Sequence, residues 1–197
     1  MEPRQVFRAY HEPTDAVNDL VLPRFCARCG GPCEQQSVEG GVRARCGRCG
    51  FMHYKNPQPA IAVLIVESDH FVLGKRISTS LQHGLWCLPC GYVEYHEDYL
   101  SAAVREVKEE TNLDINIRSI VSVVTNYLKP EVHSLVTVLM AEPTGGELIA
   151  GDGMAEVRWF PYTGQFPAMA FAADTHIISR YFETRLAGAP VDPRYAG

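Results

Sequence analysis

The chain has 197 residues, 46% hydrophobic and 21% charged, with a formal net charge of −5, a balance that predicts one globular main domain plus a small accessory module. No apolar run approaches the roughly 18 residues of a membrane-spanning helix, and the N-terminus lacks the apolar segment of a signal peptide. We therefore expect a cytoplasmic protein with reduced cysteines and no membrane association, whose acidic charge makes a nonspecific nucleic-acid binder an unfavoured class.

Changes in composition along the chain predict four segments. Residues 1–22 show no hydrophobic period and are expected to be a lead-in with at most one short helix. Residues 23–56 are rich in Cys, Gly and Arg and too poor in apolar side chains to build a core, so they need another source of stability. Residues 57–187 are expected to form the main domain, and residues 188–197 a flexible tail.

The small module contains two Cys-x-x-Cys pairs, Cys26 with Cys29 and Cys46 with Cys49, separated by sixteen residues. This spacing is typical of a four-thiolate zinc site. Four thiolates fill the tetrahedron of Zn²⁺ and leave no position for water, so we expect a structural zinc ribbon. The alternatives are two disulfides or four free thiols. Cys33 is an additional cysteine that either replaces a ligand or stays unligated.

The main domain is predicted to combine strands and helices. Two strands, 60–66 and 71–73, are separated by four polar residues and predict a hairpin. Short connections between strands argue against a repeating βαβ pattern and favour an α+β fold with a mixed sheet flanked by helices. The other predicted elements are helices at 98–111 and 170–186 and strands at 117–124, 134–140 and 157–160.

A third Cys-x-x-Cys pair, Cys87 and Cys90, lies in a segment that Leu88 and Pro89 predict to be extended. A redox or metal-binding role is one interpretation of this pair, and two ordinary thiols are the other.

Residues 97–113 are predicted to form an amphipathic helix that carries the chemistry. Asp98 suits the N-cap, and an apolar stripe follows at helical spacing. Glu106, Glu109 and Glu110 share the adjoining face. Because three like charges repel, a cation should compensate them, and carboxylate oxygens select Mg²⁺ or Mn²⁺. The alternative is a solvated acidic face.

The spacing Gly91-x5-Glu97-x7-Arg105-Glu106, continued to residue 113, closely resembles the Nudix box and matches eight of its nine defined positions. Asn112 stands where the family has Gly. A residue in the left-handed conformation at the end of the helix would explain both the Gly of the family and the Asn of this chain. Cys90 departs from the small residue that is usual just before the box. The resemblance covers residues 57–187, and the preceding module resembles the zinc ribbon of NADH-pyrophosphatase-like members.

The resemblance implies a Nudix-type mixed sheet sandwiched by helices. It also implies a pyrophosphohydrolase, dependent on Mg²⁺ or Mn²⁺, that cleaves a nucleoside diphosphate linked to another moiety by water attack at phosphorus. ADP-ribose, FAD, NADH or a similar dinucleotide would be the substrate, although only residues 165–167 echo the signature of NADH pyrophosphatases.

The resemblance further implies roles for the residues of the box. Arg105 would pair with Glu97 and hold the helix carboxylates in position. The implied metal ligands are the side chains of Glu106, Glu109 and Glu110 and the backbone carbonyl of Gly91.

Outside the box, Glu156 is the candidate general base, and a strand-edge ion pair is its alternative role. Glu147 and Asp152 are further candidates. Tyr127 and Phe166 could stack on a base of the substrate or belong to ordinary core packing.

Two other functions stay open. The chain could be a noncatalytic Nudix-like nucleotide sensor, although three retained glutamates argue against it. It could also hydrolyse dinucleotide caps on RNA, with the ribbon arginines touching RNA; the competing explanation is that these arginines balance the thiolate charge. A homodimer is a reasonable assembly. The arginines concerned are Arg24, Arg28, Arg43, Arg45 and Arg48.

Overall fold

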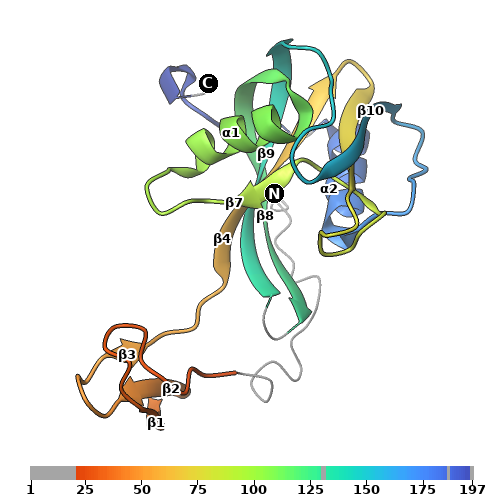
Figure 1. The fold of residues 1–197 in the computed structure, drawn as a ribbon. Coiled ribbons are helices and arrows are strands. Elements are labelled where there is room, and N and C mark those ends of the chain that lie inside the picture. Colours follow the sequence, from red (N-terminus) through yellow and green to blue (C-terminus); the bar gives the residue numbers. More distant parts are fainter. Residues whose placement is uncertain (1–20, 130–131, 186, 196–197) are drawn as a thin grey trace.

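The computed structural model describes residues 21–129, 132–185 and 187–195, so almost all of the predicted lead-in lies outside the described residues. The described residues form two separate sheets, one of three strands and one of eight. Figure 1 shows the small sheet standing apart from the large one, joined to it by an extended segment, residues 54–57. None of the described helices combines the length and apolar character needed to cross a membrane.

The small sheet is antiparallel and consists of β1 (Cys33–Val38), β2 (Gly41–Cys46) and β3 (Met52–His53). Its buried apolar residues within the described part of the chain are Cys26, Ala44 and Cys46. Such a small apolar interior cannot offset the entropy of ordering about thirty residues, so the cysteine cluster has to stabilise this module.

The large sheet has eight strands: β4 (Gln58–Glu67), β5 (His70–Arg76), β6 (Trp86–Cys87), β7 (Cys90–Tyr92), β8 (Asp114–Lys129), β9 (Val132–Gly145), β10 (Met154–Pro161) and β11 (Ala189–Pro190). Its main order is β10-β5-β4-β9-β8-β11, with β6 beside β5 and β7 beside β4. β4 and β9 are parallel and the other pairs antiparallel, so the predicted mixed sheet is confirmed. The predicted hairpin at β4 and β5 is also confirmed.

Helices α1 (Tyr99–Thr111) and α2 (Ala172–Thr184) cover opposite faces of this sheet (Figure 1). Alternation along β4 makes this possible, because successive side chains of a strand point to opposite faces. Ile61 and Val63 pack in one cluster with α1, whereas Ala62 and Leu64 pack in another with α2. The expected sheet between helices is confirmed.

The structure differs from the predictions mainly at the ends of elements. β8 and β9 are longer than the predicted strands, because their ladder continues beyond the apolar runs that predicted them. In contrast to the expected flexible tail, Ala189 and Pro190 pair with β8. Gly188 permits this approach with a φ of +72°, since a Cβ there would lie 2.4 Å from the carbonyl oxygen of Ile120.

Candidate functional site

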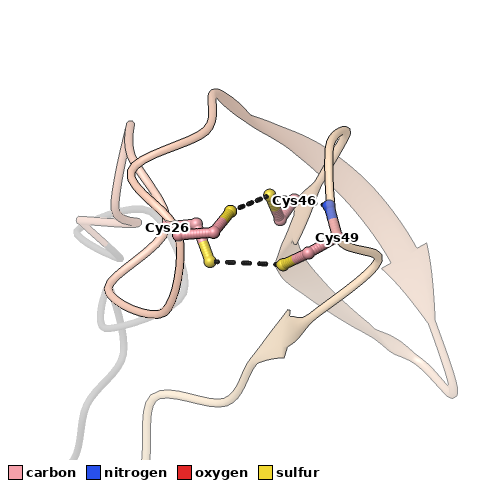
Figure 2. A group of neighbouring side chains, drawn as sticks. Cys26, Cys46 and Cys49 are labelled. Atoms are coloured by element: carbon pink, nitrogen blue, oxygen red, sulfur yellow. Dashed lines mark hydrogen bonds between the residues drawn. The ribbon is translucent and has the colours of Figure 1, made fainter.

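The four paired cysteines of the small module converge. Their sulfur atoms all lie within 4.8 Å of one another, with Cys26 to Cys49 at 3.7 Å and Cys29 to Cys46 at 3.5 Å. Figure 2 shows Cys26, Cys46 and Cys49 pointing toward one another. Zn–S bonds of about 2.3 Å imply sulfur–sulfur edges of about 3.8 Å in a tetrahedron, so the cluster has the dimensions of a zinc site.

The local hydrogen bonds favour the thiolate form of Cys46. The amide of Cys49 donates to Sγ of Cys46 at 3.4 Å and helps to lower the pKa of that thiol to about 6. Cys33 lies opposite Cys46 in the sheet but is not one of the four converging sulfurs. The geometry therefore supports a four-cysteine metal site with Cys33 as a neighbour, and four free thiols are the alternative without metal.

Helix α1 begins and ends as its sequence predicts. Asp98 Oδ1 accepts hydrogen bonds from the amides of Leu100 (2.9 Å) and Ser101 (3.1 Å), so it caps the helix. Asn112 ends the helix in the left-handed conformation, with a φ of 60°. A glycine and an asparagine are the residues that adopt this conformation most readily, which explains the departure from the box.

Arg105 organises the acidic face of α1. Its guanidinium donates two hydrogen bonds to Glu97, at 2.6 and 2.9 Å, as the pairing predicted from the box requires. The same group donates to Glu106 at 2.8 Å and to Glu109 at 3.0 Å. Hydrogen bonds from Arg105 lower the pKa of Glu97 to about 2, so this carboxylate stays ionised.

Glu110 points away from this network into the protein. Its side chain is buried, and Oε2 accepts a 2.9 Å hydrogen bond from the amide of Cys90. Burial raises the pKa of Glu110 to about 10, and the neighbouring thiol of Cys90 adds to this rise. A buried carboxyl with this environment needs a nearby cation to ionise at neutral pH.

Gly91 lies directly against the carboxyl group of Glu106. A Cβ on Gly91 would approach that carboxyl to within 2.1 Å, so a side chain at this position would displace it. Burial raises the pKa of Glu106, a half-buried group. Gly91 and Glu106 are therefore brought together as the box predicts.

The three glutamates do not form a compact ligand cluster as they stand. Over the described ranges, the four cysteines are the sole group of three or more His, Cys, Asp or Glu ligand atoms gathered within 4.8 Å. Arg105 binds Glu106 and Glu109 on the outer side, whereas Glu110 is bound to Cys90. Arg105 thus holds two of the three carboxylates, and a backbone amide holds the third.

The loop that leads to β10 covers the C-terminal end of α1. The amides of Ile149, Gly151 and Asp152 donate to the carbonyls of Thr111, Glu110 and Glu109, at 3.0, 3.0 and 2.9 Å. These bonds satisfy carbonyls that the helix leaves free at its end. Asp152 thus contributes its backbone here, and Glu147 contributes its carbonyl to Asn112 at 2.9 Å.

Glu156 lies on β10, at the edge of the sheet, and its carboxylate pairs with Arg158. The strand-edge ion pair, which is the alternative role of Glu156, is therefore present. Phe166 packs against Phe71 and Tyr162 in the aromatic part of the core. Tyr127 pairs through its backbone with His133 in the β8–β9 ladder, and its side chain lies outside the described part of the structure.

A cavity of about 370 Å³ adjoins the acidic face. Cys90 and Gly91 belong to its lining, and the same two residues contact Glu110 and Glu106. Mostly apolar residues of β4, β8 and β9 form one side, and Phe171 at the start of α2 is also part of the lining. The cavity has the size and apolar character of a small-molecule site.

Two charged residues of this cavity, Asp174 and Arg76, were not predicted from the sequence. Asp174 is buried, accepts a 3.0 Å hydrogen bond from the amide of Leu88, and has its pKa raised by burial to about 7. Arg76 donates to Sγ of Cys87 (3.6 Å) and of Cys90 (4.0 Å). The sequence did contain a signal for Asp174, because it is an acidic residue inside the apolar stripe of a predicted helix.

Comparison with known proteins identifies the larger part of the chain. The NUDIX domain family model matches residues 56–181. The chain is 30% identical over 184 residues to the NAD-capped RNA hydrolase NudC of Stutzerimonas stutzeri, covering 92% of this chain and 64% of that protein. It is 32% identical over 141 residues to the protein of that name from Edwardsiella ictaluri, covering 71% and 52%. The chain thus spans less than two thirds of these relatives.

A solved structure agrees with this match. The crystal structure of a Nudix hydrolase from Nitrosomonas europaea has a TM-score of 0.72 with this chain at 29% identity, covering 86% of this chain and 96% of that one. The family model matches well over half of the sequence, and the box that it contains lies on a capped helix beside a cavity. The chain belongs to the Nudix family.

Proposed function

We propose that this protein is a metal-dependent pyrophosphohydrolase that cleaves the diphosphate of a nucleoside diphosphate linked to a second group. Its substrate would be ADP-ribose, FAD, NADH or a related dinucleotide, and water would attack phosphorus. Residues 57–187 would form the catalytic domain and residues 23–56 a zinc ribbon held by Zn²⁺ on the four converging cysteines.

The observation that carries this proposal is the position of the buried Glu110 carboxyl. It lies on the face of α1 that carries Glu106, and Cys90 and Gly91 connect both glutamates to the cavity. Hard oxygen ligands with an unmet need for positive charge fit Mg²⁺ or Mn²⁺. A substrate whose second group fills the cavity would place its diphosphate against these carboxylates.

The residues of the box then have distinct proposed tasks. Glu106, Glu110 and the carbonyl of Gly91 would hold the metal, with Glu109 as a further ligand. When bound, the metal ion would neutralise pyrophosphate oxygens and lower the pKa of a water molecule. Arg105, anchored on Glu97, would orient the carboxylates. Glu156 is the proposed general base.

Asp174 and Arg76 would recognise the group in the cavity. A carboxyl and a guanidinium at one wall supply an acceptor and donors, so they suit a base or amide with both kinds of group. Apolar walls and the ring of Phe171 would contact its flat faces. The names of the relatives in two bacteria, NAD-capped RNA hydrolases, make a dinucleotide a consistent choice.

The test is phosphate release, after phosphatase treatment, from ADP-ribose, NADH, FAD, diadenosine polyphosphates and nucleoside triphosphates with Mg²⁺ or Mn²⁺. We expect turnover of one dinucleotide and a loss of at least about a hundredfold in Glu110→Gln. Glu67→Gln, an exposed glutamate at the end of β4, is the matched control and should keep full activity. In Glu156→Gln, kcat should fall while Mg²⁺ affinity stays unchanged.

Each other outcome has a defined meaning. Tight, metal-dependent binding of a dinucleotide without turnover would show that the protein is a nucleotide sensor and not an enzyme. Turnover of a dinucleotide at the 5′ end of RNA, faster than that of the free dinucleotide, would favour the RNA-cap hydrolase. Equal activity of wild type and Glu110→Gln would show that the proposed active site around Glu110 is wrong.

A further inference from the structure

The small module holds a fifth cysteine that the proposed zinc site does not use. The sulfur atoms of four cysteines lie within 4.8 Å of one another, and Cys33 is not part of that group, which consists of Cys26, Cys29, Cys46 and Cys49. Four thiolates already complete the tetrahedron of Zn²⁺, so Cys33 would keep a free thiol with the metal bound. A free thiol beside a metal-bound thiolate has a chemistry of its own, because the two sulfurs can form a disulfide when an oxidant removes two electrons.

The register of the small sheet places Cys33 next to one of the four ligands. Cys33 on β1 lies directly opposite Cys46 on β2, its antiparallel neighbour. The amide of Cys33 donates to the carbonyl of Arg24 at 2.9 Å. The amide of Cys46 donates to the carbonyl of Phe51 at 2.9 Å, and its carbonyl accepts from the amide of Gly50 at 3.0 Å. All three bonds lead away from the opposite strand, so Cys33 and Cys46 form a non-hydrogen-bonded pair.

A non-hydrogen-bonded pair has the spacing that a disulfide needs. In such a pair the two Cα atoms lie about 4.5 Å apart and both side chains emerge on the same face of the sheet. Disulfides join Cα atoms that are about 4.4 to 6.8 Å apart. Cys33 and Cys46 can therefore be joined without moving β1 and β2 apart or together.

A small oxidant can approach this pair. Cys33 is partly exposed, whereas the side chain of Cys46 is only 1% exposed. A cavity of about 390 Å³ has Cys46 in its lining, together with Gly47 and Gly50, which have no side chains to fill it. Hydrogen peroxide is little larger than water, so it fits this cavity and comes close to Cys46.

We propose that Cys33 makes the small module sensitive to hydroperoxides, because it forms a disulfide with Cys46 that removes one of the four metal ligands. The role assigned to Cys33 rests on the zinc ribbon of the proposed function and does not depend on the hydrolysis of a dinucleotide. The hydrophobic clusters of the described residues contain none of the five cysteines of the module. Oxidation would therefore weaken the module and leave the core of the larger domain intact.

The reaction is a two-electron oxidation of two sulfurs. The Cys46 thiolate attacks hydrogen peroxide, the O–O bond breaks, and a sulfenic acid and a hydroxide ion form. The Cys33 thiol then attacks the sulfur of the sulfenic acid. The S–O bond breaks, the S–S bond forms, and the oxygen leaves as water with the thiol proton. Both sulfurs are oxidised, and both oxygens of the peroxide are reduced.

The free state of Cys33 favours this disulfide over one between two ligands. A bond from Cys46 to Cys33 costs the site one metal–sulfur bond, whereas a bond from Cys46 to Cys29 costs it two. Three thiolates remain, one fewer than a closed tetrahedral site needs, so the module should hold Zn²⁺ more weakly. A dithiol such as dithiothreitol restores both thiols by exchange, which makes the change reversible.

The experiment treats the full, zinc-loaded chain with hydrogen peroxide. A chromophoric chelator that is too weak to remove zinc from the reduced protein reports release by absorbance. Disulfides are mapped by mass spectrometry after alkylation of free thiols and proteolysis. In wild type we expect release of about one zinc ion per chain and a disulfide between Cys33 and Cys46. Dithiothreitol should restore both thiols and zinc binding.

One variant removes the free thiol and keeps the four ligands. Cys33→Ser should contain as much zinc as wild type before oxidation and release it at least about tenfold more slowly, because the sulfenic acid then meets only thiols that already bind the metal. Ser37→Ala, an exposed change on the same strand, is the matched control and should release zinc at the wild-type rate. Cys87→Ser removes a buried thiol of the larger domain and should also release zinc at that rate.

Other results would overturn the role of Cys33. Release from Cys33→Ser at the wild-type rate would show that the ligands oxidise without its help. Disulfides confined to the pairs Cys26–Cys29 and Cys46–Cys49 would show the same. A Cys33→Ser protein that lacks zinc before oxidation would show that Cys33 is itself a ligand.

Failure of the proposed function gives different results. A chain that never binds zinc would overturn both the zinc ribbon and the role of Cys33. Normal zinc release with the disulfide between Cys33 and Cys46, but without hydrolysis of any dinucleotide, would overturn the enzyme and support the oxidation-sensitive module.

Discussion

Arg105 shows how one residue can hold several carboxylates. It forms two hydrogen bonds with Glu97 and also contacts Glu106, Glu109 and the carbonyl of Tyr92. A planar guanidinium can satisfy these directions together, whereas an ammonium group cannot. Positioning of these carboxylates is therefore the task that we propose for Arg105.

Replacement of Arg105 by Lys should reduce kcat and the affinity for Mg²⁺ by about 10- to 100-fold, because the carboxylates lose their fixed orientation. Steady-state kinetics with a Mg²⁺ titration would measure both. In the control Arg118→Lys, whose ion pair with Glu142 lies elsewhere, both values should equal those of wild type. A large loss of kcat with unchanged Mg²⁺ affinity would contradict the positioning role.

The buried carboxyl of Asp174 should make stability depend on pH. Burial raises its pKa from 3.8 to about 7, so the folded state holds a proton that the unfolded state releases. The stabilising contribution is full below about pH 4 and is lost as the pH rises through about 7. The buried Glu110 shifts in the same direction.

We expect the free energy of unfolding of the metal-free protein to decrease between about pH 4 and pH 7, and Asp174→Asn to flatten this decrease. Urea unfolding at a series of pH values would measure it. Asp152→Asn, an exposed aspartate, is the control and should follow wild type. An increase in stability of the wild type over this range, relative to Asp174→Asn, would contradict the assignment.

At the scale of the element, α1 places its carboxylates because both of its ends are defined. Asp98 caps the start, and Asn112 turns the chain in the left-handed conformation at the end. The loop over that end then donates three amides to the last carbonyls. The helix therefore cannot shift along its axis without breaking these bonds.

Asn112→Ala should lower the free energy of unfolding by about 1 kcal/mol, because alanine disfavours the left-handed conformation and loses the hydrogen bond to Glu147. Asn112→Gly restores the usual family residue and should cost less, since glycine adopts this conformation without steric penalty. Calorimetry would report a decrease in Tm of about 2–4 °C for the alanine variant. Equal Tm values for the two variants would argue against the conformational explanation.

At the scale of the whole molecule, the two sheets depend on different sources of stability. The hydrophobic clusters of the described residues begin at Ala60 and contain α1, α2 and the large sheet. The small sheet has the cysteine cluster in place of a core. Its folding should therefore require metal, whereas that of the larger domain should not.

Removal of zinc with a strong chelator should unfold the small module and leave the thermal transition of the large domain within a few degrees of its original value. NMR would show this as the loss of dispersed amide signals of β1 and β2 only. Cys29→Ser should have the same effect, and Cys33→Ser, outside the four converging sulfurs, should retain zinc. Unfolding of both the small module and the large domain on chelation would show that the stability of one depends on the other.

Local sequence determined most of the elements of this protein and pointed to its proposed chemistry. The hydrophobic period predicted α1, β-rich apolar runs predicted β4, β5, β8, β9 and β10 of the large sheet, and the spacing of cysteines and glutamates predicted two metal sites. These features depend on residues close together in the chain, so periodicity and ligand spacing record them. The left-handed Asn112 was predictable for the same reason.

Only the tertiary structure decided where distant residues meet. Asp174 on α2 approaches Leu88, Arg76 on β5 approaches Cys90, and β11 pairs with β8, contacts that join residues far apart in sequence. The burial that raises the pKa of Glu110 likewise comes from packing of the whole domain. Solvent exclusion and long-range contacts depend on how all elements pack together, and no local pattern contains that information.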